Sequence, residues 1–258
     1  LNEQITFFRV RTKKTGQGAA VKDVENILHL PYALKDKASS MRFSSKGTPS
    51  LYLGTTTYGC SKECNWNGKD EMYASVFVPN AEGQRLKILN LTISEALISG
   101  TYNRRGQGYN RTLYELQNKM LKIFPLVIAT SFSVECEEKI KYQYLISQEL
   151  MEVALQNGID GIAYLSMKGK NEFQYPQGVN LAIPATDISE TKQYSEKCNC
   201  FDVSRPILYC NQKEEEKKSY INKTYIGSFL AKVDIDGESK FYGDTEFGKF
   251  DNYLVKNL

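Results

Sequence analysis

Short apolar runs separated by polar and glycine-containing stretches mark the first part of the chain. Their lengths suit strands, and two of them, 72–78 and 86–91, alternate between apolar and polar positions. Apolar side chains at every second position line one face of a strand. The pattern predicts strands over 5–10, 50–54, 72–78 and 86–91, one short helix over 21–28, and loops over 13–19 and 35–46.

Helical spacing appears further along the chain. Apolar residues recur at that spacing over 111–124 and 142–156, and Asn157-Gly158 supplies a stop after the second stretch. The threonines at 55–57 can cap a helix over 58–64. The remaining pattern predicts strands over 159–165, 179–183 and 225–235, followed by a loose terminal element over 247–258.

The order of these elements is irregular, and no internal repeat is present. A doubly wound sheet needs a regular alternation of strands and helices, so the sequence favours an α+β fold. At 258 residues the chain is long for one domain and short for two, which predicts one core with an added segment. The polar stretch over 189–220 is expected to be a solvated linker, with an interaction surface as the alternative.

Charge and hydropathy narrow the class of protein. The net charge of +3 comes from 33 basic and 30 acidic side chains spread along the chain, so we expect neither nucleic acid nor a membrane as a partner. No apolar run approaches the roughly 18 residues of a membrane span. The first ten residues do not form a secretory signal, which predicts a cytoplasmic protein. The chain begins with leucine, which predicts processing and a missing upstream segment.

Six cysteines and one histidine limit the chemistry that the chain can perform. In a chain of this size the cysteines are expected to be free thiols, and no metal site is expected. The alternative is a zinc site at Cys198, Cys200 and Cys210, which lacks an obvious fourth ligand. We expect His29 in a turn or in the core, so acid–base chemistry would fall to carboxylates, Tyr, Lys or Arg.

Two stretches carry polar side chains where a plain core would exclude them. One is Met41–Gly54 with a glutamate soon after it, and the other is a tyrosine–serine strand end. The residues that stand out are Arg42, Gly47, Leu51-Tyr52-Leu53, Glu63 and Tyr164-Leu165-Ser166. This ordered set resembles the RES domain, a family named for its arginine, glutamate and serine and found in bacterial NAD+-degrading toxins. The opening Phe8-Arg9-Val10-Arg11 and the strand that holds Asn180 are also similar.

The resemblance implies an ADP-ribosyltransferase-like fold, with a split, bent β core, flanking helices and NAD+ in the cleft. It implies cleavage of the nicotinamide–ribose bond by hydrolysis or phosphorolysis. NAD+ would then be the substrate, inorganic phosphate the alternative co-substrate to water, and an antitoxin protein the partner, with no further cofactor. The NAD-consuming domain is expected over 1–188. Residues 189–258 extend beyond the compact family members and are expected to pack on the same domain.

The family pattern assigns catalytic roles to Arg42, Tyr52, Glu63 and Ser166. Breaking the bond to nicotinamide builds positive charge on the ribose, which the Glu63 carboxylate can stabilise. Arg42 offers a planar fork for a pyrophosphate or phosphate, and Tyr52 can stack on nicotinamide or bond a ribose hydroxyl. Ser166 is expected to hydrogen-bond nicotinamide or ribose. Judged by residue type alone, each has an alternative role without chemistry: Glu63 as a solvated helix glutamate, Arg42 as a surface arginine and Tyr52 as a core tyrosine.

Three further residues are expected to bind the same ligand. Arg9 and Lys46 are candidates for its phosphates, and Asn180 can read it from a strand edge; a solvated basic loop and a plain strand-edge asparagine are the alternatives. Two other functions remain open: an ADP-ribosyltransferase that modifies a macromolecule, and a non-catalytic binding module that retains the fold. Release of free ADP-ribose would favour cleavage of NAD+ over both of these alternatives.

Overall fold

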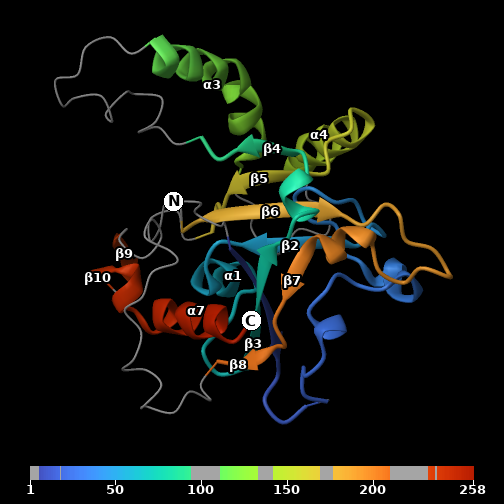
Figure 1. Ribbon diagram of the computed structural model, residues 1–258, viewed down its shortest axis with the longest axis vertical. Coiled ribbons are helices and arrows are strands. Elements are labelled where there is room, and N and C mark those ends of the chain that lie inside the picture. Colours follow the sequence, from blue (N-terminus) through green and yellow to red (C-terminus); the bar gives the residue numbers. More distant parts are fainter. Residues whose placement is uncertain are drawn as a thin grey trace.

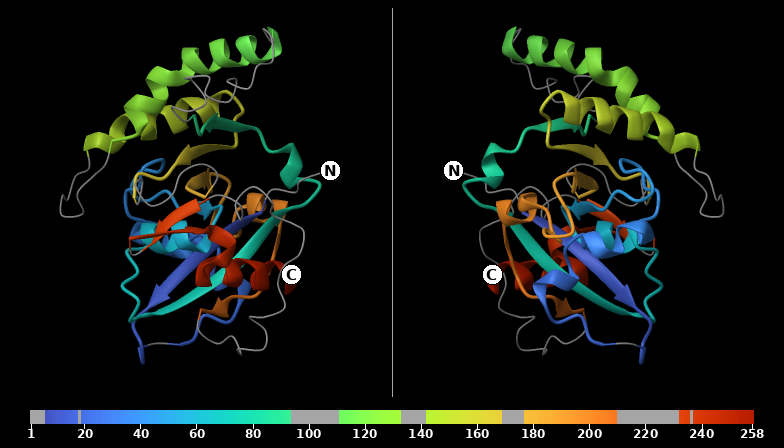
Figure 2. Two further views of the ribbon diagram at one scale, coloured as in Figure 1. Left: turned by 90° about the vertical axis from the view of Figure 1, so that its left-hand side faces the viewer. Right: turned by 90° about the vertical axis from the view of Figure 1, so that its right-hand side faces the viewer.

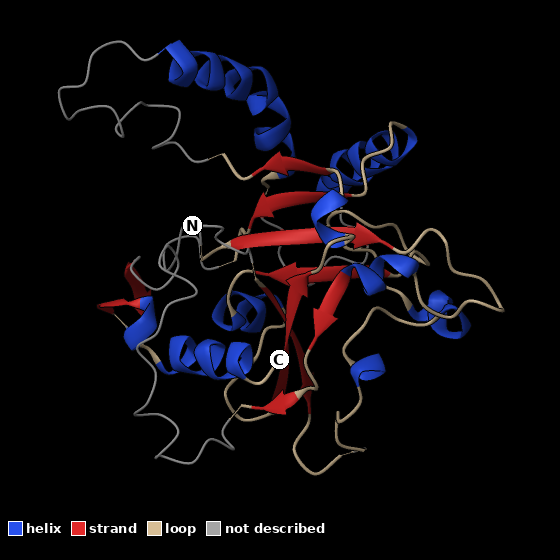
Figure 3. Cartoon of the chain, in the orientation of Figure 1, coloured by secondary structure: helices blue, strands red, loops and turns tan. Residues whose placement is uncertain are grey.

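The computed structural model describes residues 6–17, 19–93, 111–132, 142–168, 177–209, 232–235 and 237–258. These residues form a mixed α+β structure in which one curled sheet is flanked by helices (Figure 1). Figure 3 shows the strands running through the middle of the molecule, with helices at its ends and beside the longest strands. The expected α+β class with a bent β core is confirmed.

The large sheet has eight strands in the order β4-β5-β6-β2-β1-β3-β7, and β8 pairs with β3 beside this path. Its strands are β1 (Phe7–Lys13), β2 (Ser50–Gly54), β3 (Glu71–Pro79), β4 (Ile88–Leu91), β5 (Gly161–Leu165), β6 (Val179–Pro184), β7 (Phe201–Val203) and β8 (Ile207–Leu208). Among the described strands of this sheet, β4 and β5 are parallel and the other pairs are antiparallel. A separate hairpin pairs β9 (Lys232–Ile235) with β10 (Glu238–Phe241).

Four α-helices are described, with short 3-10 turns between them. The α-helices are α1 (Thr57–Glu63), α3 (Arg111–Thr130), α4 (Leu145–Gln156) and α7 (Glu246–Lys256). The 3-10 turns are η1 (Val24–Asn26), η2 (Tyr32–Lys37), η3 (Gly83–Arg85), η5 (Tyr142–Tyr144), η6 (Glu196–Cys200) and η7 (Tyr242–Asp244). None of the helices in the described ranges is long and apolar enough to cross a membrane.

One face of the sheet is covered by the α-helices. Phe8 and Val10 of β1 pack with Phe250 and Leu254 of α7, and α1 lies against the same strand. Towards the β4 edge, α3 and α4 cover a second apolar cluster that includes Ile162. Figure 2 shows α3 and α4 at one end of the molecule, away from α7.

The other face of the sheet is covered mainly by turns. Leu51 and Leu53 of β2 lie there with Phe77 of β3, and Ile27 and Phe201 pack against them. Because side chains alternate along each strand, neighbouring residues of one strand face opposite layers. This alternation decides which candidate residues share a site.

Several predicted elements differ in the structure. The helix expected over 21–28 is reduced to the single turn η1. The stretch beyond 189 is not a solvated linker as far as residue 209, because η6, β7 and β8 form there and Phe201 is buried. Residues 212–219 lie outside the described part. Only 232–235 of the strand expected over 225–235 is described as β9, and the remainder lies outside the described residues.

The terminal element is a regular helix, not a loose one. The Thr245 side chain accepts a hydrogen bond from Gly248 N and caps α7 at its start. Phe247, Phe250 and Leu254 then recur at helical spacing and face the sheet. Residues beyond 188 therefore add strands to the sheet and a helix to one of its faces. The domain boundary at residue 188 itself stays a prediction.

Candidate functional site

Helix α1 carries Glu63 in its last turn, and both of its ends are fixed. At the start, Thr56 Oγ1 accepts a hydrogen bond from Gly59 N at 3.0 Å and donates one to Gln177 O at 2.9 Å. Threonine at this position caps a helix, as the sequence predicts. The buried Asp251 of α7 also accepts hydrogen bonds from Thr57 N at 3.3 Å.

The end of α1 forms a Schellman motif. Trp66 N donates to Ser61 O at 3.0 Å and Asn65 N donates to Lys62 O at 3.1 Å, while Asn65 adopts a positive φ of 51°. Asparagine tolerates this left-handed conformation better than other residues that carry a side chain. The motif stops the helix immediately after Glu63, so this side chain points from a fixed last turn.

The close approach of α1 to the sheet depends on Gly54, the last residue of β2. A Cβ atom at this position would lie 2.7 Å from Cys60 Sγ and 3.1 Å from Asn180 Oδ1. Any side chain would therefore force the helix or Asn180 to move. The glycine allows α1 to lie directly over the junction of β2 and β6.

Glu63 meets two donors that come from other elements. Ser166 Oγ, just after β5, donates to Glu63 Oε1 at 2.6 Å, and Asn180 Nδ2 of β6 donates to the same oxygen at 2.9 Å. Ser166 and Asn180 are only 6% and 5% exposed. Among the described residues, none donates to Glu63 Oε2. Within the described part of the chain, the carboxylate is thus held through one oxygen only.

The Ser166 hydroxyl has two acceptors within reach, Glu63 Oε1 at 2.6 Å and Lys168 O at 3.1 Å, while its oxygen accepts a hydrogen bond from Lys168 N at 3.1 Å. The shorter contact, to the charged carboxylate, is the stronger one. Ser166 therefore acts as a donor to the carboxylate. A nucleophilic serine would need a base to remove that proton, and His29 is engaged elsewhere.

Tyr164 lies beside these residues, directly opposite Asn180 in the β5–β6 pair. Burial raises the pKa of Tyr164 well above its usual value, and the charge of Glu63 raises it further, while a hydrogen bond from Asn180 acts in the opposite direction. Tyr52 and Arg42 also act on Tyr164 electrostatically. Tyr164 is therefore close enough to feel the charges of both Glu63 and Arg42.

Tyr52 reaches the same side of the sheet from β2. Its hydroxyl accepts a hydrogen bond from Phe43 N at 3.1 Å and lies 3.0 Å from Ser44 Oγ. Burial raises the pKa of Tyr52 to about 12, so the phenol stays protonated at any physiological pH. Its contacts fix the turn that carries Arg42.

Arg42 is held by the two helices at the end of the molecule. Arg42 Nη1 donates to Thr130 O, the last residue of α3, at 2.5 Å, and the guanidinium lies 5.0 Å from the centre of the Tyr144 ring. Gln148 of α4 anchors the same turn by donating to Met41 O at 2.8 Å. Arg42 is 9% exposed, and no described carboxylate pairs with it. A guanidinium without a carboxylate partner is suited to bind a phosphate.

We call these residues the Glu63 cluster: Arg42, Tyr52, Glu63, Tyr164, Ser166 and Asn180. All four predicted catalytic residues and one predicted binding residue belong to it. The two that it brings into direct contact with Glu63 are Ser166 and Asn180. Tyr52 packs against the apolar cluster that contains Tyr164, and the charges of Arg42 and Glu63 both act on Tyr164.

Lys168 is a neighbour that the sequence did not single out. Its Nζ atom donates to Glu63 O at 3.1 Å and to Asn65 Oδ1 at 2.8 Å. A cation at a helix C-terminus is favourable for the helix dipole. Lys168 thus ties the end of α1 to the end of β5. The sequence could have indicated Lys168 through its position two residues after Ser166. Tyr164, two residues before Ser166, is indicated in the same way.

Arg9 and Lys46 are not brought into the cluster. Arg9 alternates with Phe8 and lies on the opposite face of β1, where its Nη1 donates to Tyr52 O at 2.9 Å. Lys46 is exposed in a turn and contacts none of Glu63, Ser166 or Asn180. Arg9 therefore reaches the cluster only through the backbone oxygen of Tyr52, and the predicted role of Arg9 and Lys46 as ligands of the same molecule stays a prediction.

His29 lies in the core, and the described cysteines are free thiols. Ser195 N donates to His29 Nε2 at 3.0 Å, and Nδ1 donates to Leu30 O at 2.7 Å, so both ring nitrogens are engaged in the core. Burial lowers the pKa of His29. Cys198 and Cys200 are free thiols, and Cys210 lies outside the described residues. Within the described ranges, no group of three His, Cys, Asp or Glu residues could hold a metal ion.

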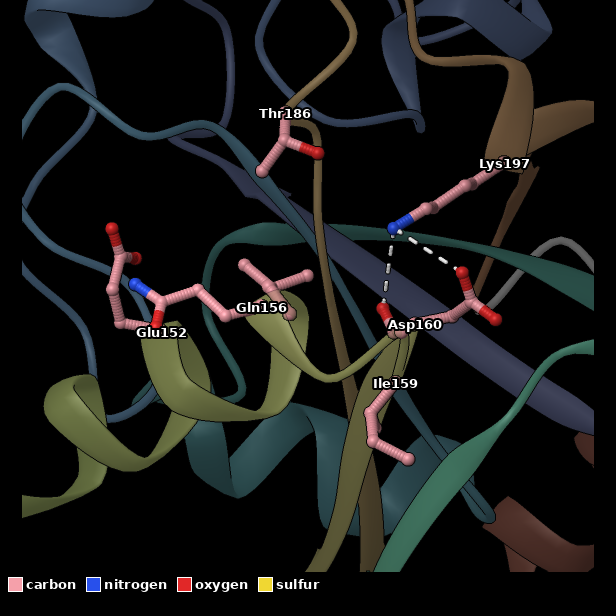
Figure 4. A pocket seen from close by; sticks show the side chains of 8 residues that line it. Glu152, Gln156, Ile159, Asp160, Thr186 and Lys197 are labelled. Atoms are coloured by element: carbon pink, nitrogen blue, oxygen red, sulfur yellow. Dashed lines mark hydrogen bonds and ion pairs between the residues drawn. The ribbon is translucent and has the colours of Figure 1, made fainter.

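A pocket of about 400 Å³ lies elsewhere, at the start of β5 (Figure 4). Its lining includes Gln156, Asp160 and Lys197, and Figure 4 shows the Lys197 ammonium directed at Asp160, to which it is paired at 3.7 Å. Ser166 follows the opposite end of β5. The pocket contains none of the predicted site residues and no member of the Glu63 cluster.

Comparison with known proteins gives one clear relative in sequence. The chain is 26% identical over 257 residues to a protein of Bacillus subtilis (strain 168) named putative toxin YopC. The match covers 97% of this chain and 56% of YopC, so the chain spans about half the length of that relative. No family model matches the chain.

Among solved structures, the chain is similar to the crystal structure of the M. tuberculosis MbcT–MbcA toxin–antitoxin complex. The two chains are 11% identical, with a TM-score of 0.38 over 80% of this chain and 84% of the other. This similarity is too low to assign a fold. The resemblance to the RES family that the motifs indicate therefore stays a prediction.

Proposed function

We propose that the chain is a toxin-like enzyme that consumes NAD+ by cleaving its nicotinamide–ribose bond. The observation that carries this proposal is the Glu63 carboxylate, held through one oxygen by Ser166 and Asn180. Three segments far apart in the sequence converge to hold this one charge. A carboxylate fixed in this way, in a cluster with two protonated tyrosines and an arginine that has no carboxylate partner among the described residues, suits a reaction that develops positive charge on a sugar.

In the proposed reaction the bond between the ribose C1 carbon and the nicotinamide nitrogen breaks. Both bonding electrons leave with the nitrogen, so neutral nicotinamide departs and the ribose carbon becomes an oxocarbenium-like centre. Glu63 stabilises that charge. A water or phosphate oxygen then forms the new bond to the carbon; water also loses a proton, which Glu63 accepts or passes to solvent. The products are ADP-ribose or its 1-phosphate.

The other members of the Glu63 cluster are assigned to binding. Arg42 has no described carboxylate partner and offers two parallel donors to a phosphate or pyrophosphate. Tyr52 is neutral at physiological pH, so it contributes a ring face or a hydroxyl donor and no charge. Ser166 and Asn180 first hold the carboxylate and can exchange these contacts for contacts to the ribose.

The similarity to a protein named putative toxin supports the toxin-like part of the proposal. An enzyme that removes NAD+ from its own cell must be restrained. We therefore include in the proposal a cytoplasmic setting and an antitoxin protein that blocks the enzyme until it is released.

The proposed function is tested by an assay that identifies which molecule accepts the ADP-ribose group. Purified protein is incubated with NAD+ in phosphate-free buffer, with phosphate, and with added cell protein, and the products are separated by chromatography. Free ADP-ribose would identify a hydrolase and ADP-ribose-1-phosphate a phosphorylase. If the ADP-ribose label were recovered only on macromolecules, the chain would be a transferase instead. Intact NAD+ in all three mixtures would exclude the proposed function.

A further inference from the structure

A second group of polar side chains lies on the face of the sheet opposite the Glu63 cluster. Arg9 and Arg11 of β1 alternate with Phe8 and Val10, which pack under α7 on the other face. In the β1–β3 pair, Arg9 lies directly opposite Ser75. Directly opposed side chains of an antiparallel pair project to the same face. The two guanidinium groups and the Ser75 hydroxyl therefore share one patch.

Backbone carbonyls accept hydrogen bonds from only some of the donors in this patch. Arg9 Nη1 donates to Tyr52 O at 2.9 Å and Arg11 Nη2 donates to Leu28 O at 2.7 Å. Arg9 Nε, Arg11 Nε and Ser75 Oγ are buried and find no partner among the described residues. Buried donors without an acceptor are uncommon in folded proteins. All three groups can donate, so the patch calls for a ligand that accepts.

The charge of the patch is also uncompensated. No described carboxylate forms an ion pair with Arg9 or Arg11, and the charge of Arg11 acts unfavourably on Arg9. The titratable groups around them are the thiols of Cys60, Cys64 and Cys198, the Tyr194 phenol and the neutral His29 ring. Burial and the neighbouring Arg11 lower the pKa of Arg9 to about 9. Two like charges placed together in this way favour an anionic partner.

We propose that Arg9, Arg11 and Ser75 form a binding site for a small inorganic oxyanion of the phosphate class. The two Nε–H groups and the hydroxyl supply donors, and the guanidinium charges supply the attraction. A water molecule would satisfy single donors and leave both charges unpaired. As whole residues, Arg9 and Arg11 are each only partly buried, whereas the three donor atoms themselves are buried. The bound anion would link β1 and β3 to the segment that carries Leu28.

The site is separate from the one proposed for NAD+, because it lies across the sheet from Glu63. Its occupation is expected to stabilise the folded chain and not to supply a reacting phosphate. The two can be told apart by variants: Arg11→Gln removes a ligand of this site, and Arg42→Gln removes the phosphate candidate of the Glu63 cluster. Arg9 is left intact in these tests, because it also bonds the backbone of Tyr52.

The experiment measures binding of inorganic phosphate by calorimetry and its effect on the melting temperature, at constant ionic strength maintained with NaCl. Wild type is expected to bind phosphate saturably and to melt at a higher temperature when it is bound. Arg11→Gln and Ser75→Ala are expected to weaken binding tenfold or more. Ser75→Ala is the safer variant for folding, since it removes a hydroxyl that has no partner among the described residues. Arg85→Gln is the matched control, because Arg85 is an exposed arginine paired with Glu82.

Saturable binding of sulfate in the same way would support an oxyanion site. The proposal would be overturned if phosphate neither bound nor raised the melting temperature, which would leave water as the occupant. If chloride alone raised the melting temperature to the same extent, the site would not be specific for oxyanions, and this result would also overturn the proposal. If Arg42→Gln abolished phosphate binding and Arg11→Gln did not, the anion would belong to the Glu63 cluster.

Discussion

At the scale of single residues, the structure distinguishes the groups that hold Glu63 from those that merely lie near it. Ser166 and Asn180 both donate to the same carboxylate oxygen. Hydrogen bonds to a charged acceptor are shorter and stronger than neutral ones, and they fix direction. The position of this one oxygen is therefore determined by side chains from two strands.

Ser166→Ala tests this arrangement. Without the hydroxyl the carboxylate loses its shorter hydrogen bond, and we expect kcat for NAD+ cleavage to fall by about 10²-fold while KM changes less. Steady-state kinetics measure this, with circular dichroism to confirm the fold. Asn180→Asp should reduce kcat as well, because it places a second negative charge beside Glu63. Unchanged kcat in both variants would show that these contacts do not position the carboxylate.

The ordered motif in the sequence identified five members of the Glu63 cluster, because their types and spacing could be compared with a family pattern. It did not identify Tyr164 or Lys168 as site residues, since a buried tyrosine and a loop lysine are ordinary on their own. Arg9 was assigned to the same ligand as Glu63, but strand alternation places it on the other face. The sequence could not show which face of β1 the helix α1 would cover.

At the scale of elements, α1 is short and depends on its ends. The sequence shows the threonines that cap it, and Thr56 caps it in the structure. The Asn65 stop is also local, whereas the hydrogen bonds from Lys168 come from the end of β5, which lies about a hundred residues further along the chain. Local pattern therefore predicted both ends of the helix to within one residue, but not the contact from Lys168. The sequence pattern also did not predict α7 as a regular helix, because only a few apolar residues in it recur at helical spacing.

Replacing the cap tests the contribution of this element. Thr56→Ala removes the acceptor for Gly59 N and the donor to Gln177 O, so we expect a loss of about 1–2 kcal/mol in the free energy of unfolding. Urea denaturation measures it. Thr56→Ser keeps the hydroxyl and should lose much less. Equal stability of the alanine and serine variants would contradict the capping role.

Gly54→Ala tests the close approach of α1 to the sheet. The new methyl group would lie 2.7 Å from Cys60 Sγ and 3.1 Å from Asn180 Oδ1, so the helix or Asn180 must shift. We expect a lower melting temperature together with a loss of NAD+ cleavage in the protein that remains folded. Gly16→Ala, at an exposed turn with open space around it, is a control for activity, although its positive φ makes some loss of stability expected there too. Full activity of Gly54→Ala would argue against the tight junction.

At the scale of the whole molecule, the C-terminal helix is linked to the helix that carries Glu63. Asp251 of α7 is buried and accepts hydrogen bonds from Thr57 Oγ1, from Thr57 N and, at 2.6 Å, from Tyr242 Oη. These contacts bring residues some 194 positions apart into one polar group. The link depends on tertiary packing, so no local pattern of the sequence indicates it.

The Asp251 carboxyl gives this link a pH dependence. Burial raises its pKa from 3.8 to about 7, although its hydrogen-bond donors act in the opposite direction. Between these values the folded chain holds a proton that the unfolded chain has released. The stability that it contributes is therefore complete below about pH 4 and is lost as the pH rises to about 7, with a slope of up to about 1.4 kcal/mol per pH unit.

Denaturation of wild type and Asp251→Asn at pH 5, 6, 7 and 8 checks this prediction. The asparagine does not titrate, so the difference in unfolding free energy, wild type minus variant, should fall between pH 5 and 7 and level off above that. Comparing the two proteins at each pH removes the contribution of other titrating groups. Parallel profiles would show that Asp251 keeps an ordinary pKa in the folded chain.

The central claim, that the Glu63 carboxylate cleaves NAD+, is tested most directly by measuring nicotinamide release from NAD+ by wild type and by Glu63→Gln. Glutamine keeps the size of the side chain and one acceptor oxygen for Ser166 and Asn180 but removes the charge. We predict that wild type releases nicotinamide, and that Glu63→Gln remains folded, still binds NAD+ and releases nicotinamide at least 10²-fold more slowly. Equal release by both proteins would contradict the claim, as would a folded wild type that releases none.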